Sequence, residues 1–120
     1  MAGIGNINLK VLLLDTDFYA LQAVNSYFAW DRRTRVTFMA ESVEAMWQHI
    51  NETPFAELPD VVVLDSDHMG GPERLRTMIM ELRARIPHVR IICIAQHVDP
   101  ALVDVAADTG ASGYLLKQEV

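Results

Sequence analysis

Short runs of aliphatic residues alternate along this chain with segments of helical period, and this alternation restricts the fold more than any other feature. The runs are continuous, as in the residues 61–64, Val-Val-Val-Leu. Continuous apolar strands are typical of a parallel sheet that is covered on both faces. The intervening segments repeat apolar residues every three or four positions, which favours amphipathic helices. The alternation therefore predicts an α/β fold with right-handed crossovers.

The same patterns predict five strands and four helices within one domain that occupies residues 1–120. Residues 1–9 are expected to lead into the first strand. Helix starts are indicated by Ser42, by Pro72 after two glycines, and by the pair Asp99-Pro100. The strands are expected at residues 10–15, 36–40, 61–65, 90–95 and 112–117.

Charge and length exclude several classes of protein. The chain carries 16 acidic residues against 10 lysines and arginines, for a net charge of −6, which argues against direct binding to nucleic acid or to an anionic membrane. Its longest apolar run, residues 91–95, is far shorter than the roughly 18 residues of a membrane span. With no signal-peptide pattern at the start, we expect a cytoplasmic protein. The lone Cys93 is expected to be a small buried hydrophobe.

Three charged residues stand where predicted strands end. Asp15 ends the first strand, Asp65 the third and Lys117 the fifth. Ligands of open parallel sheets bind beyond the carboxyl ends of the strands, so we expect these three side chains to converge at one edge. Two neighbouring carboxylates repel each other unless a divalent cation or an ammonium group lies between them. The pattern thus indicates that a divalent cation, the ammonium group of Lys117, or both offset the charge of the two carboxylates.

The chain resembles the receiver domains of response regulators, the phosphoacceptor modules of bacterial two-component signalling. The resemblance extends from Lys10 to Lys117 and rests on the motifs KVLLLD, PDVVVLD and GASGYLLK. The last motif is especially similar to receivers that carry a C-terminal helix-turn-helix DNA-binding domain. The resemblance implies a flavodoxin-like, doubly wound five-stranded parallel sheet of strand order 2-1-3-4-5. It also implies a signalling domain of a transcription regulator, not an enzyme.

The resemblance implies a role for several residues. Asp65 would be the phosphoacceptor and Lys117 a phosphate contact, while Asp15, Asp65 and the backbone carbonyl of Asp67 would hold Mg²⁺. Tyr114 would be the aromatic switch residue. A histidine kinase or a small phosphodonor would modify Asp65, because Mg²⁺ and a lysine can offset the charge of the transferred phosphoryl group.

Two positions depart from the receiver pattern. Thr16 stands where receivers usually carry a second acid, and Ala95 stands where they usually carry the serine or threonine of the switch. Asp17 is a neighbouring substitute for the acid, although a side chain one residue along points elsewhere. The departures predict a degenerate site with weak or absent Mg²⁺ binding. They also leave open a pseudo-receiver that works without phosphate, as a protein-interaction, dimerisation or ligand-sensing module.

Two further expectations concern the loop after Asp65 and the end of the chain. His68 lies beside Asp65 and Asp67, but the sequence offers no further ligands at the spacing of a transition-metal site. Receivers usually have a fifth helix after the lysine, whereas three residues follow Lys117. We therefore expect the fifth helix and an output domain to be missing from this chain, and the uncovered sheet face to need further chain or a partner.

Overall fold

The computed structural model describes residues 8–29 and 33–119 and contains one parallel sheet of five strands. The strand order is β2-β1-β3-β4-β5, which confirms the predicted flavodoxin-like topology. The strands are β1 (Leu9–Leu14), β2 (Thr34–Ala40), β3 (Val61–Asp65), β4 (Arg90–Ala95) and β5 (Gly113–Leu116).

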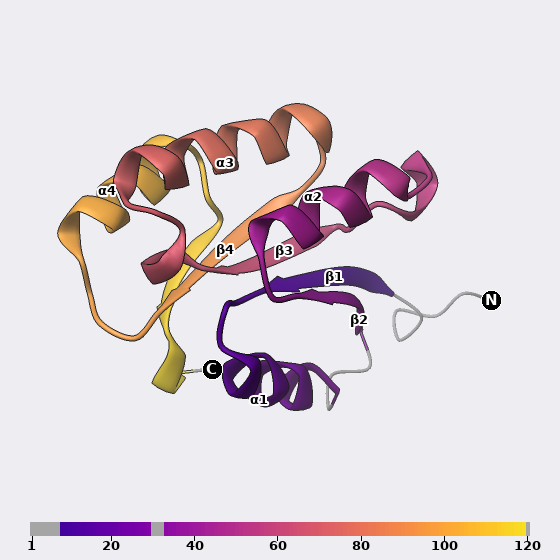
Figure 1. Ribbon diagram of the computed structural model, residues 1–120, viewed down its shortest axis with the longest axis horizontal. Helices are drawn as coiled ribbons and strands as arrows, with labels where there is room; N and C mark the ends of the chain where they lie inside the picture. Colours follow the sequence, from indigo (N-terminus) through magenta and orange to yellow (C-terminus); the bar gives the residue numbers. More distant parts are fainter. Residues whose placement is uncertain (1–7, 30–32, 120) are drawn as a thin grey trace.

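Helices cover the two faces of the sheet unequally. Figure 1 shows α2, α3 and α4 on one face and α1 alone on the other. Within the described part of the chain, no helix has the length and apolar composition to cross a membrane. The helices are α1 (Phe18–Ala29), α2 (Val43–Glu52), α3 (Pro72–Arg85) and α4 (Pro100–Asp108), with 3₁₀ turns η2 (Phe55–Glu57), η3 (Ser66–His68) and η4 (Lys117–Glu119).

The predicted helix starts are found where capping residues stand. Ser42 Oγ accepts a hydrogen bond from the Ala45 amide at 3.1 Å, which caps α2. Asp99 caps α4 in the same way, and Pro72 is the first residue of α3. Gly71, just before α3, has a φ of +99°, a conformation that a residue with a side chain rarely adopts.

The bounds of three strands, β1, β2 and β5, differ from the prediction. The pairing of β1 with β2 extends back to Leu9 and Thr34, so Leu9 belongs to the sheet and not to the lead-in. Strand pairing needs only backbone groups and can extend past the apolar run that marks a strand in the sequence. β1 ends at Leu14 and β5 spans only Gly113–Leu116, so Asp15 and Lys117 are the first residues beyond their strands.

The core lies in two layers, one on each face of the sheet. The larger layer packs alternate residues of β1 and β3, such as Leu12 and Leu64, against α2, α3 and α4. The smaller layer packs Val11, Leu13 and Val63 against α1. The single helix leaves part of this second face open, because Ile92 is only half-buried and Leu115 is exposed.

Cys93 lies in the larger layer and is fully buried, as expected. Burial raises the pKa of its thiol to about 12, because the charged thiolate would have to leave water. The thiol therefore stays neutral near pH 7, and Cys93 acts as a packing residue.

Candidate functional site

The structure brings Asp15, Asp65 and Lys117 together at the carboxyl edge of the sheet. Lys117 Nζ lies 2.9 Å from Asp15 Oδ2 and 3.6 Å from Asp65 Oδ1. Both carboxylates are buried, whereas 18% of the lysine side chain is exposed. The ammonium group thus compensates two buried negative charges, one just after the end of β1 and one at the end of β3.

The ionisation of these groups follows from burial and from their mutual distances. Burial raises the pKa of Asp65, and the charge of Asp15 adds to this effect, while His68 and Lys117 oppose it. Burial also acts to lower the pKa of Lys117, but the contacts with Asp15 and Asp65 outweigh it, so this pKa lies above its ordinary value. Lys117 is therefore a permanent cation near pH 7.

Both oxygens of Asp65 already have partners within its own loop. Oδ1 accepts a hydrogen bond from the Asp67 amide at 3.1 Å, which caps η3. Oδ2 lies 2.5 Å from His68 Nδ1, and this hydrogen bond, helped by the charge of Asp65, raises the pKa of His68. This contact between Asp65 and His68 was not predicted from the sequence. The separation of three residues between Asp65 and His68 could have indicated it, because residues i and i+3 of a 3₁₀ turn lie one above the other.

Two other residues of this loop form hydrogen bonds to the end of β4 and to the residue that follows it. The Asp67 carboxylate accepts a hydrogen bond from the Gln96 amide at 2.7 Å, so its side chain faces the loop between β4 and α4. Ser66 is buried, and its hydroxyl donates to the carbonyl of Ile94 at 3.2 Å. Nothing in the sequence pattern pointed to either contact.

The altered positions lie at the same edge of the sheet. Thr16 is exposed, and Ala95 is the buried last residue of β4. Asp17 does not take over the place of Thr16, because its Oδ1 accepts hydrogen bonds from the amides of Tyr19 and Ala20 at the start of α1. The site therefore lacks both a second acid after Asp15 and a hydroxyl side chain at the end of β4.

Tyr114 in β5 points into the protein. Its ring is half-buried and packs against the larger core layer. Its hydroxyl is buried, and no hydrogen-bond partner for it is found among the residues described. A buried hydroxyl without a partner is energetically unfavourable, so this side chain would gain from a position in which its hydroxyl reaches water.

The oxygen atoms of the site fit a hard cation. Asp15 Oδ2 is buried, and its nearest described partner is the ammonium group of Lys117 at 2.9 Å, so this oxygen already faces a cation. Mg²⁺ binds one or two carboxylates and keeps several waters, so Asp15, Asp65 and the backbone carbonyl of Asp67 suit it. Across residues 8–29 and 33–119, no three side chains of His, Cys, Asp or Glu are grouped to hold a metal ion. The site therefore offers Mg²⁺ two carboxylates and a backbone carbonyl, without a third metal-binding side chain among the described residues.

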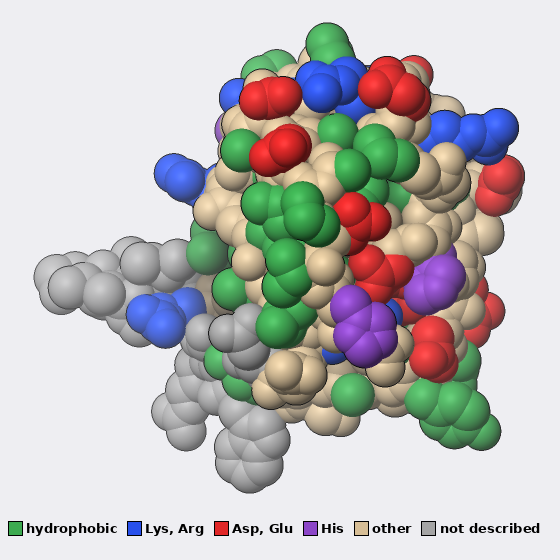
Figure 2. All heavy atoms as spheres, turned by 90° about the vertical axis from the view of Figure 1, so that its left-hand side faces the viewer, with side chains coloured by type: hydrophobic (Ala, Val, Ile, Leu, Met, Phe, Trp, Pro, Cys, Tyr) green, Lys and Arg blue, Asp and Glu red, His purple; other side chains and the backbone are tan. Residues whose placement is uncertain are grey.

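The surface at this edge mixes acidic and basic groups. Figure 2 looks onto the edge and shows histidine and carboxylate side chains lying side by side. A hollow of about 500 Å³ here is lined by His68 and His97 together with Asp67 and Asp99. The surroundings of Asp65 are thus polar and open to water, although Asp65 itself is covered.

Comparison with known proteins identifies the family. The sequence matches the response regulator receiver domain over residues 11–119, so the chain belongs to this family. Receiver domains are signalling modules of two-component systems and bind Mg²⁺ at their phosphorylation site.

Two transcriptional regulators are similar in sequence. The chain is 38% identical over 80 residues to the transcriptional activator protein ExaE of Pseudomonas putida, an alignment that covers 65% of this chain and 34% of ExaE. It is 37% identical over 62 residues to the transcriptional regulatory protein DegU of Brevibacillus brevis, covering 50% of this chain and 25% of DegU. The matched region therefore spans about a third and a quarter of these relatives.

Solved receiver structures share the fold. The signal receiver domain of the response regulator NarL from Mycobacterium tuberculosis superposes with a TM-score of 0.74 at 26% identity, covering 94% of this chain and 86% of that one. The receiver domain of RcsB from Salmonella enterica serovar Typhimurium, solved with the phosphomimetic BeF₃⁻, gives a TM-score of 0.76 at 21% identity and covers 92% and 78%.

Proposed function

We propose that this receiver domain is a degenerate two-component switch whose phosphoacceptor is Asp65. The observation that carries the proposal is the position of Lys117 Nζ, within 3.6 Å of both Asp15 and Asp65. A carboxylate that attacks a phosphoryl group needs compensation for its own charge and for the charge of the phosphoryl oxygens. Lys117 supplies part of it, and bound Mg²⁺ would supply the rest.

The proposal includes a weakened response to phosphorylation. Ala95 offers no hydroxyl that could bond the phosphoryl group, and the loop that follows it is already held by Asp67 through the Gln96 amide. Thr16 removes one carboxylate from the metal site. These features support slow modification and a small conformational response at Tyr114.

The second candidate function is partner binding without phosphate, and the surface of α1 favours it. This helix contains no charged residue, and Phe18, Tyr19 and Tyr27 are all exposed on it, Tyr19 to 82%. Phe18 and Tyr19 contact each other edge to face at the start of the helix, and such an exposed aromatic pair on an uncharged helix favours a protein-interaction surface. The partner would be a histidine kinase or a second copy of this chain.

We further propose that this domain controls a DNA-binding output domain in a longer protein. The similarity to two transcriptional regulators, of which the matched region is only a part, supports this proposal. The exposed Leu115 and half-buried Ile92 on the α1 side of the sheet would then be covered by further chain or by a partner.

We expect Mg²⁺ to bind weakly, with a dissociation constant above the millimolar range. Affinity at such sites rises with the number of carboxylates, so Thr16→Asp is expected to tighten binding by about tenfold. Titration followed by Trp and Tyr fluorescence measures the constant. The neutral variant Thr16→Asn is the control and should resemble the parent. Saturation of the parent well below a millimolar would show that the site is not weakened.

Acetyl phosphate with Mg²⁺ is expected to phosphorylate only a small fraction of the chain, because Thr16 and Ala95 each remove a favourable contact. Intact-mass measurement follows the gain of one phosphoryl group, with Asp65→Asn as the blank. Stoichiometric incorporation lost in Asp65→Asn would show a fully active receiver. Incorporation that persists in Asp65→Asn would mean that Asp65 is not the phosphoacceptor.

A further inference from the structure

Asp65 has no exposed surface, although its proposed reaction needs one free carboxylate oxygen. Its exposed fraction is 0%, so neither oxygen can be reached by a phosphodonor in this conformation. Attack on phosphorus requires a carboxylate oxygen in line with the leaving oxygen, at close to van der Waals distance. Some group that covers Asp65 must therefore move before the reaction.

The groups around Asp65 differ in their freedom to move. Oδ1 is covered by the backbone amide of Asp67 and by Lys117, which is itself paired with Asp15. Oδ2 is covered by the ring of His68, whose side chain is 56% exposed. Displacing the amide would break the turn, and displacing the ammonium would leave two buried charges uncompensated. The histidine ring is the group that can leave at the lowest cost.

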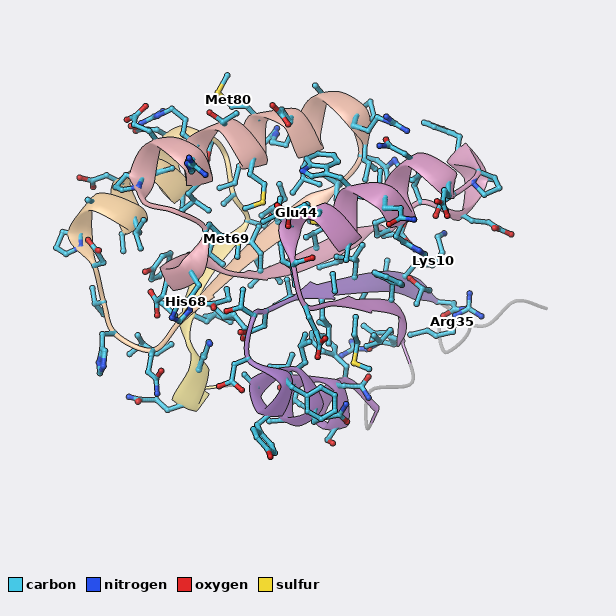
Figure 3. The ribbon with its side chains drawn as sticks, in the orientation of Figure 1. Lys10, Arg35, Glu44, His68, Met69 and Met80 are labelled. Atoms are coloured by element: carbon cyan, nitrogen blue, oxygen red, sulfur yellow. The ribbon has the colours of Figure 1, made fainter. Side chains whose placement is uncertain are left out.

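Space for this movement exists on both sides of the ring. His68 lines the hollow between η3 and the loop before α4, and it also lines a second hollow of about 540 Å³ between α2 and α3. Figure 3 shows His68 on η3, at the edge of the sheet. A change of its side-chain rotamer would carry the ring into either hollow without displacing the core.

We propose that His68 is a further residue of the phosphoacceptor site, a side-chain cap on Asp65 Oδ2 that must swing away before Asp65 binds Mg²⁺ or attacks a phosphodonor. His68 is a positioning residue, because it acts through Asp65. When the cap is open, a bond forms between Oδ2 and phosphorus as the bond from phosphorus to the acetyl oxygen breaks, and acetate leaves with the electron pair. This inference rests on the proposed function of Asp65.

Two measurements on His68→Ala test the cap: the dissociation constant for Mg²⁺ and the initial rate of phosphoryl incorporation from acetyl phosphate. Removing a charge-assisted hydrogen bond that competes with the ligand is expected to raise the rate by about tenfold and to tighten Mg²⁺ binding by several-fold. His68→Gln, which keeps a donor at this position, should lie between His68→Ala and the parent. His97→Ala is the matched control, because His97 is an exposed histidine of the same edge without a described contact to Asp65.

These outcomes distinguish a failure of the proposed cap from a failure of the proposed phosphoacceptor. Unchanged rate and unchanged Mg²⁺ affinity in His68→Ala overturn the cap, even if Asp65→Asn proves Asp65 to be the phosphoacceptor. Equal effects of His68→Ala and His97→Ala also overturn it, because the change would then reflect surface charge alone. Tighter Mg²⁺ binding in His68→Ala, with no incorporation in any variant, would support the cap and refute the proposed phosphoacceptor.

Discussion

Replacing Lys117 by methionine is expected to lower the free energy of unfolding by about 2–3 kcal/mol. The substitution keeps most of the aliphatic volume and removes the cation that lies between Asp15 and Asp65. Both carboxylates are buried, so water cannot take over the role of the ammonium group. For a domain of this size, a change of this magnitude corresponds to a fall in Tm of about 10 °C.

The loss of stability should depend on pH. Because burial raises the pKa of Asp65, the folded state binds this proton more tightly than the unfolded chain, so stability rises as the pH falls through the folded pKa towards the ordinary 3.8. Lys117 lowers the pKa of Asp65, so removing Lys117 raises this pKa further. The gain in stability on lowering the pH is then larger in Lys117→Met than in the parent. The difference between Lys117→Met and the parent should therefore be smaller at about pH 5 than at about pH 8.

Denaturant unfolding at both pH values measures these differences, and the chain offers a matched control. Lys10 pairs with Asp60 at 3.5 Å, but both side chains are partly exposed, so Lys10→Met should cost under about 1 kcal/mol. The double variant Asp15→Asn/Lys117→Met should recover part of the stability, because only one buried charge then remains. If Lys117→Met costs no more than Lys10→Met, the ammonium does not compensate the buried pair.

The fold was predictable from the sequence because its signals are local. Continuous runs such as residues 61–64 identify buried strands without knowledge of their partners. The meeting of Asp15 and Lys117 was also predictable, because all strands of a parallel sheet end at the same edge. Strand bounds were less predictable, since backbone pairing at Leu9 and Thr34 continues beyond the apolar residues.

The contacts that distinguish this site were not predictable. The capping of Asp65 by His68 depends on a single rotamer in a 3₁₀ turn, and the bond from the Gln96 amide to Asp67 joins two loops 29 residues apart. Neither contact leaves a periodic pattern in the sequence. The changes at Thr16 and Ala95 were visible, but only because the resemblance to receivers supplied the residues to compare.

Restoring the two altered residues is expected to have the largest effect on phosphorylation. In Thr16→Asp/Ala95→Thr, the new carboxylate would strengthen Mg²⁺ binding, and the new hydroxyl would donate a hydrogen bond to the phosphoryl oxygens at the end of β4. Each contact stabilises charge that develops during transfer, and a donor of this kind is worth on the order of a hundredfold in rate. Acting together, the two changes should raise the rate of incorporation by at least about a hundredfold.

The proposed role of Asp65 is tested most directly by the rate of phosphoryl incorporation into this double variant, measured by intact mass with acetyl phosphate and Mg²⁺. We predict trace incorporation in the parent and fast incorporation in Thr16→Asp/Ala95→Thr, all of it abolished by adding Asp65→Asn. An unchanged rate in a folded double variant would contradict the claim that Asp65 lies in a receiver site weakened at these two positions. Incorporation that survives Asp65→Asn would contradict the assignment of Asp65 itself.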